Sequence, residues 1–301
     1  MHKVGERFDG YGFGGVDAGV PPMKFEEYSE LYKDYFHMKR RDGIIEVQLH
    51  TDDGPTTWGI GINRAIQNLF RIINDDHENE VLILTGSGDK WLAGMDPKAS
   101  GGLKEVARDP KLYAKFTYDG GYANDYRVMM NQLYDLQIPV VAAINGWSLT
   151  HTEFMLICDI TICTPDSEFK DVHFGAGTVP GDGQLLVFQE LLGAKRAAYL
   201  AYMNKGLNAQ EALELGVVNE VVPNDELLDR AWEIAETIAK QDVHVTRLTH
   251  DLVKRPWRKA MEDLEVHFKS EMWGYLLSQG SDDEEWFDKV HRNDAEKGEL
   301  G

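Results

Sequence analysis

The sequence predicts an α/β fold with a largely buried parallel sheet. Strand-like runs alternate along the chain with stretches that carry apolar residues at helical spacing. Some of these runs, such as residues 80–88 and 138–146, are almost continuously apolar, which is typical of strands covered by helices on both faces. The chain has 301 residues and 43% hydrophobic content, so it can bury a sizeable core. We therefore expect one large domain, alone or with an appendage.

The predicted elements begin near residue 36, where the pattern becomes periodic. The run GIIEVQLHT alternates as a strand does, and EVLILTGSG ends in a glycine turn. In chain order, the predicted elements are a strand at 43–51, a helix at 63–76, a strand at 80–88, a helix at 126–137, a strand at 138–146, a short helix at 151–158, a strand at 159–165, and two helices with a short strand within 195–223. This alternation predicts the parallel sheet.

The two ends of the chain differ from the core, which we assign to residues 36–223. Residues 1–35 are rich in glycine and aromatic residues without periodicity, so we expect an extended or partly ordered arm outside the core. Residues 224–301 are helical in pattern almost throughout. Aromatic side chains and methionines in this region need a surface to pack on, and a terminal helical layer often finds one on another subunit. We expect a helical oligomerisation region and a homo-oligomer.

Composition argues against several partners. The net charge of −20 repels phosphate backbones, so nucleic acid is not expected. No run approaches the roughly 18 apolar residues of a membrane span, and the N-terminus lacks the apolar core of a signal peptide. We therefore expect a cytoplasmic protein without a membrane partner. Cys158 and Cys163 lie in apolar runs without metal-site spacing, so we interpret them as reduced core residues.

The first stretch that can carry chemistry is TGSGDKWLAGMD, residues 85–96. Its glycines miss the G-x-G-x-x-G spacing of a dinucleotide site. The turn at Ala93, Gly94 and Met95 would free backbone N–H groups at the carboxyl edge of the sheet, where open α/β sheets bind ligands. An ordinary tight turn explains the same residues equally well.

A histidine stands at the start of the short helix predicted at 151–158. His151 falls in the expected first turn, where unpaired N–H groups and the positive end of the dipole favour a neutral imidazole. A neutral imidazole can donate a hydrogen bond to a developing oxyanion. Thr150 and Thr152 are candidate caps of this helix. The alternative is a structural histidine whose hydrogen bonds are satisfied.

A second histidine lies in the glycine-rich loop FKDVHFGAGTVPGDG, residues 169–183. Such a loop allows the Asp182 carboxylate to fold back on His173, fix its tautomer and raise its basicity. The other ring nitrogen can then take a proton from water. Asp171 is a rival for the orienting role, and a solvated turn with a surface histidine is the alternative.

Two histidines on sheet-edge loops favour water-based chemistry without a metal. The sequence has no nucleophile-elbow pattern and no histidine spacing such as H-E-x-x-H. No metal and no organic cofactor are therefore expected. Trp58, after the first predicted strand, would wall an apolar pocket, although a lone tryptophan is also common in a core.

Residues 38–223 resemble the crotonase (enoyl-CoA hydratase/isomerase) superfamily. The resemblance rests on ILTGSGDKWLAGMD, on PVVAAINGWSL followed by CDITIC, and on FKDVHFGAGTVPGDG followed by LLGAKRAAYLAYMNKGLNAQEALELGVVNEVV. It implies a spiral of β-β-α turns with a helical C-terminal trimerisation region, in homotrimers or dimers of trimers. Ordinary members carry a glycine run whose backbone binds a thioester oxyanion. Here Thr150, His151 and Thr152 occupy that place.

These departures are similar to the branch of 6-oxocamphor hydrolase and related β-diketone hydrolases, which use no coenzyme A. One histidine of that branch lies in an N-H-P-E stretch and matches His151, and a second precedes a V-P-G-D-G element and matches His173. The resemblance implies that Asp182 is the partner of His173 and that Trp58 lies in the site. A glutamate of the C-terminal helices matches Glu271.

The sequence with this resemblance predicts a carbon–carbon bond hydrolase that cleaves a 1,3-diketone, expected to be cyclic, to a keto acid by a retro-Claisen reaction. His173, oriented by Asp182, would take a proton from water, and His151 with the N–H of Met95 would hold the oxyanion or enolate. Glu271 would position the water or close the pocket. Two alternatives stay open: an acyl-CoA hydratase or isomerase with a rebuilt site, and a non-catalytic protein of the same fold.

Overall fold

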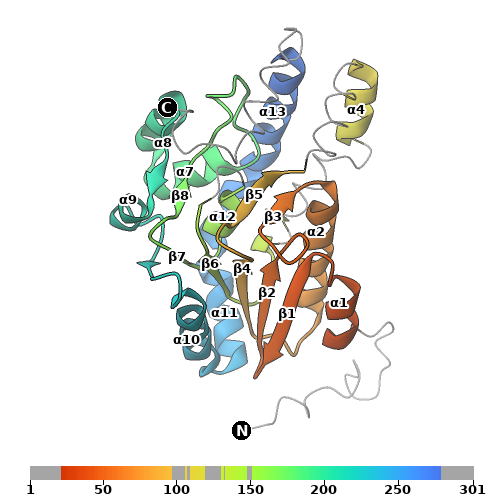
Figure 1. The fold of residues 1–301 in the computed structure, drawn as a ribbon, viewed down its shortest axis with the longest axis vertical. Helices are drawn as coiled ribbons and strands as arrows, with labels where there is room; N and C mark the ends of the chain where they lie inside the picture. The colour runs from red at the N-terminus through yellow and green to blue at the C-terminus, as the bar shows by residue number, and fades with distance from the viewer. Residues whose placement is uncertain are drawn as a thin grey trace.

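A six-stranded sheet forms the centre of the structure (Figure 1). The computed structural model describes residues 22–96, 106, 109–118, 130–131, 133–147 and 151–278. Its strands are β1 (Phe36–Arg41), β2 (Ile44–Leu49), β3 (Thr56–Trp58), β4 (Val81–Gly86), β5 (Leu92–Met95), β6 (Val140–Ile144), β7 (Ile160–Cys163), β8 (Glu168–Phe169), β9 (Leu207–Asn208) and β10 (Glu220–Val221). Its helices are α1 (Phe25–Leu31), α2 (Ile60–Asp75), α4 (Pro110–Tyr118), α6 (Glu153–Leu156), α7 (Gln184–Leu192), α8 (Ala194–Tyr202), α9 (Ala209–Glu214), α10 (Leu227–Ala239), α11 (Val243–Val253), α12 (Arg255–Ala260), the 3₁₀ helix η2 (Met261–Asp263) and α13 (Leu264–Ser278).

The strand order confirms the predicted parallel sheet. The order is β1-β2-β4-β6-β7-β10, and neighbouring strands are parallel except for the antiparallel pair β1 and β2. The sequence did not indicate β1, because its residues FHMKRR carry charges that suit an exposed edge. A smaller parallel pair, β3 with β5, lies beyond the upper end of the main sheet in Figure 1.

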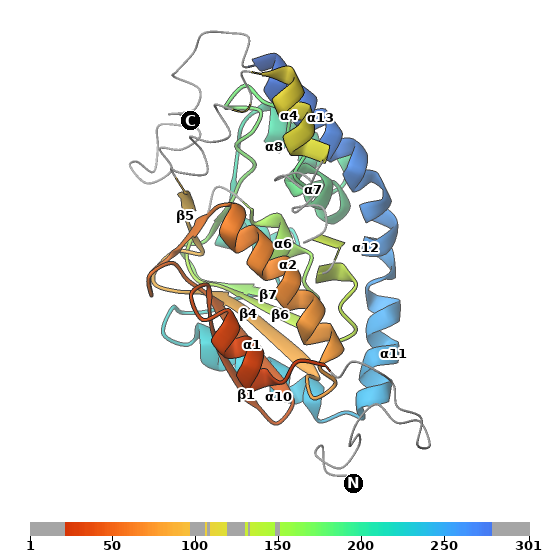
Figure 2. The same ribbon diagram turned by 90° about the vertical axis from the view of Figure 1, so that its right-hand side faces the viewer.

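Side chains of the central strands alternate between two layers of helices. In β4, Leu82 and Leu84 pack in one cluster with Ile66 of α2, whereas Ile83 packs with Ala231 of α10. Successive side chains of a strand point to opposite faces, so an apolar strand is buried only when both faces are covered. Figure 2 shows α2 lying across the sheet.

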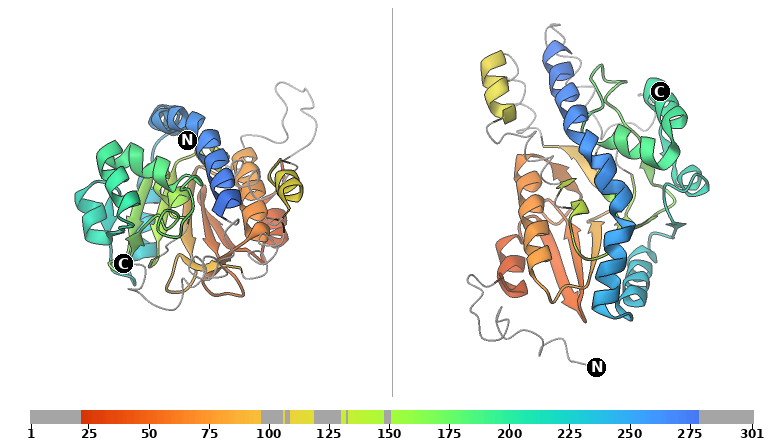
Figure 3. Two further views of the ribbon diagram at one scale, coloured as in Figure 1. Left: turned by 90° about the horizontal axis from the view of Figure 1, so that it is seen from above. Right: turned by 180° about the vertical axis from the view of Figure 1, so that it is seen from behind.

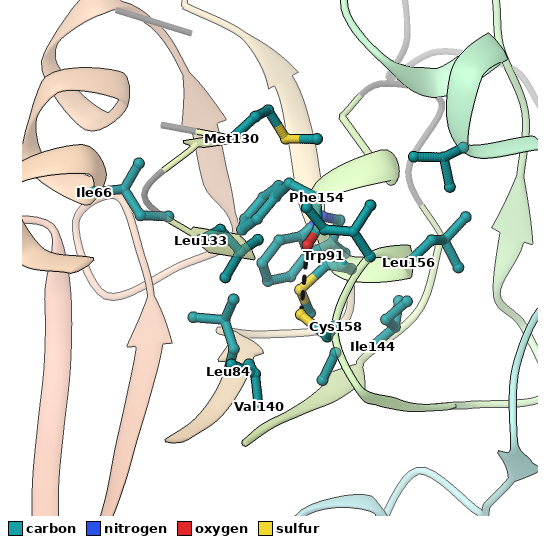
Figure 4. Close-up of a cluster of buried hydrophobic side chains, with 14 of the residues drawn as sticks. Ile66, Leu84, Trp91, Met130, Leu133, Val140, Ile144, Phe154, Leu156 and Cys158 are labelled. Carbon is teal, nitrogen blue, oxygen red and sulfur yellow. Dashed lines mark hydrogen bonds between the residues drawn. The ribbon is translucent and has the colours of Figure 1, made fainter. Parts of the chain in front are cut away.

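Part of the core lies where α6 packs against β4 and β6 (Figure 4). The rings of Trp91 and Phe154 have centroids 5.2 Å apart, and the thiol of Cys158 donates to the Phe154 carbonyl at 3.4 Å. Cys158 and Cys163 are both buried free thiols, which confirms their interpretation as reduced core residues. This packing holds α6 and the loop before it against the sheet.

The helices α11, α12 and α13 run along one side of the molecule (Figures 2 and 3). A buried polar network attaches this run to the sheet. Asp159 Oδ2 lies 3.1 Å from His250 Nε2, and Lys254 Nζ donates to the Ile157 carbonyl at 2.7 Å. The helical pattern predicted after residue 223 is confirmed as far as residue 278. Among the described residues no helix is both long and apolar enough to cross a membrane.

Part of the predicted N-terminal arm, helix α1, packs against the core. Tyr28 of α1 is fully buried, and its hydroxyl donates to Asp76 Oδ2 at 3.0 Å. Burial of an aromatic ring with its hydroxyl satisfied stabilises the attachment. The prediction that residues 1–35 lie outside the core is therefore wrong for α1. Residues 1–21 and the end of the predicted helical region, residues 279–301, lie outside the described residues.

Candidate active site

His151 adopts a backbone conformation that non-glycine residues rarely take. Its φ is +53°, in the left-handed region, which costs roughly 1–2 kcal/mol for a residue with a Cβ. The sequence placed His151 in the first turn of a helix, but α6 has four residues, begins at Glu153 and has Thr152 as its N-cap. That prediction is wrong by two residues. The left-handed turn directs the chain into α6, and a helix so short offers little dipole to the imidazole.

The predicted cap of α6 has a different function in the structure. Thr152 makes no side-chain cap, and its hydroxyl instead accepts a hydrogen bond from Gln184 Nε2 at 2.8 Å. The same Gln184 amide donates to the Lys170 carbonyl at 2.9 Å. This amide therefore links the His151 segment to the loop that carries His173. Thr150, the other candidate cap, lies outside the described residues.

The imidazole of His151 is buried against carboxyl groups and an indole. Its Nδ1 lies 3.1 Å from Glu153 Oε1 and 3.6 Å from Asp182 Oδ2. The Trp58 ring centroid lies 4.6 Å from the imidazole centroid. Burial and then the positive charge of His173 lower the pKa of His151 to about 3. His151 is therefore neutral at physiological pH, as predicted, but because of its burial rather than a helix dipole.

His173 is oriented by Asp171 rather than by Asp182. Its Nδ1 lies 2.8 Å from Asp171 Oδ1, and the same oxygen accepts the backbone N–H of His173 at 3.0 Å. Two residues separate the pair, so a local turn is enough to close both contacts. Asp182 lies on the other side of the ring, with its Oδ2 3.6 Å from Nε2. The prediction that Asp182 orients His173 is corrected accordingly.

Asp182 lies between the two histidines. Its Oδ2 is 3.6 Å from His151 Nδ1 and 3.6 Å from His173 Nε2. Glu271 of α13 joins the group from the opposite side, with Oε1 3.8 Å from His173 Nε2. The structure thus brings together four of the predicted site residues, which come from the loop before α6, the loop before α7 and the C-terminal helix.

The charges of this cluster are strongly perturbed. Burial opposes a charge on His173, but the carboxylates of Asp182 and Asp171 outweigh it and hold the pKa of His173 well above its usual range. Burial, reinforced by Asp182, raises the pKa of Glu153 well above its usual range. Burial also raises the pKa of Asp182, and it raises the pKa of Glu271 to about 8 although the His173 charge opposes the change. The surroundings of His173 therefore favour its imidazolium form, and those of Glu153 favour the neutral acid.

Several carboxyl oxygens of the cluster are available for a ligand. Within the described residues, Glu153 Oε2, Asp182 Oδ2 and Glu271 Oε2 are buried without a hydrogen-bond partner. Buried polar atoms normally have a partner, so water or a substrate is expected to supply one. Two overlapping groups also have the reach to hold a metal ion: their ligand atoms lie within 4.8 Å of one another. They are His151, Glu153 and Asp182, and His173, Asp182 and Glu271.

Trp58 and Met95 lie beside each other on the paired strands β3 and β5. Trp58 is fully buried, and its indole N–H has no partner among the described residues. The turn predicted at Ala93, Gly94 and Met95 is wrong, because all three residues lie in strand β5, where Gly94 has φ +136° and the pairing with β3 shifts register. The side chain of Met95 lies outside the described residues, and its predicted N–H contact to substrate stays a prediction.

Sequence reasoning missed Glu153 as a site residue and ranked Asp171 below Asp182. Glu153 was visible as the last residue of the stretch that matches N-H-P-E, but nothing in a linear pattern shows that its side chain turns back to His151. Asp171 was identified from the sequence as a carboxylate two residues before His173. A local turn brings it, rather than Asp182, to the Nδ1 atom of His173.

Comparison with known proteins extends this picture. The enoyl-CoA hydratase/isomerase family matches residues 40–285. Carnitinyl-CoA dehydratase from Salmonella enteritidis PT4 is 31% identical over 209 residues, 67% of this chain and 73% of that protein. The structure is also similar to a β-diketone hydrolase from the cyanobacterium Anabaena sp. PCC 7120 bound to (S)-3-oxocyclohexyl acetic acid. That likeness has a TM-score of 0.77 and 32% identity over 84% of this chain and 98% of the other.

A third similarity concerns the fold alone. An enoyl-CoA hydratase/isomerase from Mycobacterium paratuberculosis has a TM-score of 0.72 at 22% identity, over 85% of this chain and 97% of that one. Together with the family match, these structures confirm the predicted crotonase-type α/β fold.

Proposed function

The chain belongs to the enoyl-CoA hydratase/isomerase family, and we propose that within this family it is a carbon–carbon bond hydrolase that cleaves a 1,3-diketone to a keto acid. The observation that carries the proposal is the pair of histidines that share Asp182, each with a ring nitrogen 3.6 Å from Oδ2. A 1,3-diketone has two carbonyl oxygens that gain negative charge in succession. Two imidazoles can each donate a hydrogen bond to one of these oxygens. The 32% identity with a β-diketone hydrolase supports the same choice.

The first step is the addition of water to one carbonyl. A general base works best when its pKa lies near the working pH, and the pKa of Glu271 is about 8. We assign Glu271 as the group that takes the water proton as the water oxygen bonds to the carbonyl carbon. The sequence suggested His173 for this role, but an imidazole whose pKa is held well above its usual range keeps its proton at neutral pH.

His151 serves the oxyanion formed by this addition. Burial favours the neutral acid form of Glu153, whose Oε1 lies 3.1 Å from Nδ1, and in that form its hydroxyl can donate to the nitrogen. The proton of the neutral imidazole then resides on Nε2, which becomes the donor to the oxyanion. This assignment gives Glu153 the function of selecting the tautomer.

The second step breaks the carbon–carbon bond. The oxyanion collapses to a carboxylic acid, and the bonding electrons move to the neighbouring carbon as an enolate on the second carbonyl. The imidazolium of His173, held by Asp171, donates to the enolate oxygen. Glu271 returns its proton to the enolate carbon, which gives the ketone, and the new acid releases a proton to solvent. One cyclic diketone and one water therefore give one keto acid, and a linear diketone would give a carboxylic acid and a ketone.

Incubation with cyclic and linear 1,3-diketones in H₂¹⁸O tests the proposal. We expect a keto acid from a cyclic diketone, or a carboxylic acid and a separate ketone from a linear one, with one ¹⁸O in the carboxyl group, identified by mass spectrometry. His151→Ala and His173→Ala should each lose at least about 10²-fold in rate, as expected for loss of an oxyanion donor. His244→Ala, at the exposed start of α11, is the matched control and should keep the wild-type rate. A wild-type protein that opens none of the diketones would overturn the proposal.

The second candidate is a hydratase or dehydratase of an acyl-CoA thioester. It is favoured by the 31% identity with carnitinyl-CoA dehydratase. It is opposed by the side chain of His151, which stands where ordinary family members carry glycine. Crotonyl-CoA serves as the probe: a ligand of the folded state at 100 times its Kd adds about 2.7 kcal/mol of stability. Protection by crotonyl-CoA, together with inert diketones, would favour this candidate.

A further inference from the structure

The loop that carries His173 and Asp182 rests on the helix that carries Glu271 through two contacts made by glycines. At Gly181, an added Cβ would lie 2.1 Å from the His267 carbonyl oxygen and 2.5 Å from Glu271 Cβ. At Gly274, about one turn beyond Glu271 along α13, an added Cβ would lie 2.4 Å from Val179 Cγ2. Real Cβ atoms essentially never approach other atoms so closely.

The backbone conformation does not require glycine at either position. Both lack the positive φ that favours glycine elsewhere in the chain, for example at Gly183. Other residues could therefore adopt the same conformation, and what excludes them is the space between loop and helix. The function of these glycines is close approach of two backbones.

Part of the loop borders a cavity. Val179 and Pro180 line a cavity of about 770 Å³ that extends toward α8 and is also bordered by Val266, His267 and Ser270 of α13. Packing contacts are fewer where the loop borders this cavity, so the close contacts at Gly181 and Gly274 contribute more to its attachment to α13. The Gly181 backbone also donates a hydrogen bond to Glu271.

We propose that Gly181 and Gly274 are positioning residues, which seat the loop on α13 so that Glu271 faces His173 and Asp182. The inference rests on the proposed function for its catalytic consequence, but its geometric part is independent of any substrate. The catalytic groups lie on two elements that are far apart in sequence, and these glycines determine their separation. A displacement of about 1 Å at such a site costs on the order of 10²-fold in rate.

Alanine substitutions test the proposal. Gly181→Ala pushes the loop against a backbone carbonyl that cannot move aside, so kcat should fall by about 10²-fold with little change in KM. Gly274→Ala meets a side chain, so the loss should be smaller, roughly tenfold. Adding Val179→Ala removes the Cγ2 methyl at 2.4 Å but leaves the Cβ of residue 179 at 2.9 Å, so it should restore part of the rate. Gly54→Ala, whose Cβ would meet only an ordinary 3.6 Å contact, is the control and should keep the wild-type rate.

A second measurement is independent of activity. Separation of loop and helix admits water to Glu271, so its pKa should fall from about 8 toward the usual glutamate value. ¹³C-carboxyl NMR of the resting protein follows this titration, with the resonance identified by its loss in Glu271→Gln. If Gly181→Ala does not fold, the comparison of Gly274→Ala with the double variant Gly274→Ala and Val179→Ala tests the proposal instead.

The outcomes separate the two proposals. A Glu271 pKa near the usual glutamate value in Gly274→Ala, partly reversed by Val179→Ala, supports the positioning function even if no diketone is cleaved. Wild-type kcat and an unchanged Glu271 pKa in folded Gly274→Ala would overturn it. The same holds if the rate falls without rescue by Val179→Ala.

Discussion

The Nδ1 of His173 lies 2.8 Å from Oδ1 of Asp171. This contact leaves Nε2 facing Asp182 and Glu271, so one carboxylate orients the ring while two others face its reactive nitrogen. The surrounding negative charge keeps a proton on the imidazole. His173 is thereby suited to stabilise negative charge on a substrate oxygen rather than to take a proton from water.

Asp171→Asn should lower the rate of diketone cleavage by about 10²-fold, the lower end of what positioned acid–base groups contribute. It should also lower the pKa of His173, because one of the carboxylates that raise it is lost. Steady-state kinetics and ¹⁵N-histidine NMR measure the two effects. Asp166→Asn, at an exposed position, is the control. If Asp171→Asn leaves both quantities unchanged while Asp182→Asn alters them, Asp182 is the orienting residue after all.

The rate should depend on pH through Glu271. The base must be ionised, so kcat/KM should rise with pH and level off above about 8, the pKa of Glu271. At still higher pH the rate should fall again as His173 loses its proton. Glu271→Gln should be slow at every pH and should lack the rising limb. A rising limb that persists in Glu271→Gln would assign the base to another group.

His151 should make stability sensitive to acid. Its pKa is about 3 in the folded protein against 6.5 as the ordinary value, so the unfolded chain binds a proton that the folded state excludes. Stability from this group is therefore complete above pH 6.5 and is lost as pH falls toward 3. The loss amounts to roughly 1.4 kcal/mol for each pH unit between the two pKa values. Asparagine tolerates the left-handed backbone and does not titrate. Urea unfolding of His151→Asn should show a weaker loss over this pH range than wild type, and equal slopes would contradict the assignment.

Chelation should leave the proposed reaction intact. The water route uses side-chain acids and bases alone, so dialysis against EDTA should not change the rate. Added Zn²⁺ should inhibit, because His173, Asp182 and Glu271 offer ligand atoms within 4.8 Å of one another. Loss of activity on chelation, with recovery on adding a divalent cation, would replace the water route by metal-assisted hydrolysis.

Asp159→Asn should destabilise the fold. Lys254 is fully buried, and the Asp159 carboxylate, 3.8 Å away, compensates its charge. Breaking one partner of a buried pair costs about 3–5 kcal/mol because the other charge is left without compensation. Asp251→Asn removes an exposed partner of Arg258 and should cost less than about 1 kcal/mol. Urea unfolding of both variants measures the difference, and equal losses would show that Lys254 is compensated by other groups.

The fold was largely readable from local pattern. The strands at Val81–Gly86 and Val140–Ile144 are continuous apolar runs, and such runs need cover on both faces whatever the remaining topology. β1 escaped notice because an edge strand is not selected for apolar residues on both faces. α1 escaped because a single buried tyrosine carries no periodicity.

The sequence predicted which residues belong to the candidate site but not which of them contact one another. His151 and His173 were identified by their loops and by the family resemblance, and Glu271 by resemblance alone. The charge state of His173 follows from three carboxylates, two from the loop before α7 and one from the distant helix α13. The spacing of residues along the chain does not reveal the combined effect of these carboxylates, because electrostatic interactions depend on distance in space.

The sequence by itself determined the alternation of strands and helices, the buried thiols and the two histidines, because each depends on residue type and on neighbours a few positions away. The tertiary structure alone decided that Asp171 and not Asp182 orients His173, that His151 is neutral through burial, and that Glu271 reaches the cluster. The last of these depends on how closely the loop before α7 approaches α13, and that approach is set by packing between segments far apart in the chain.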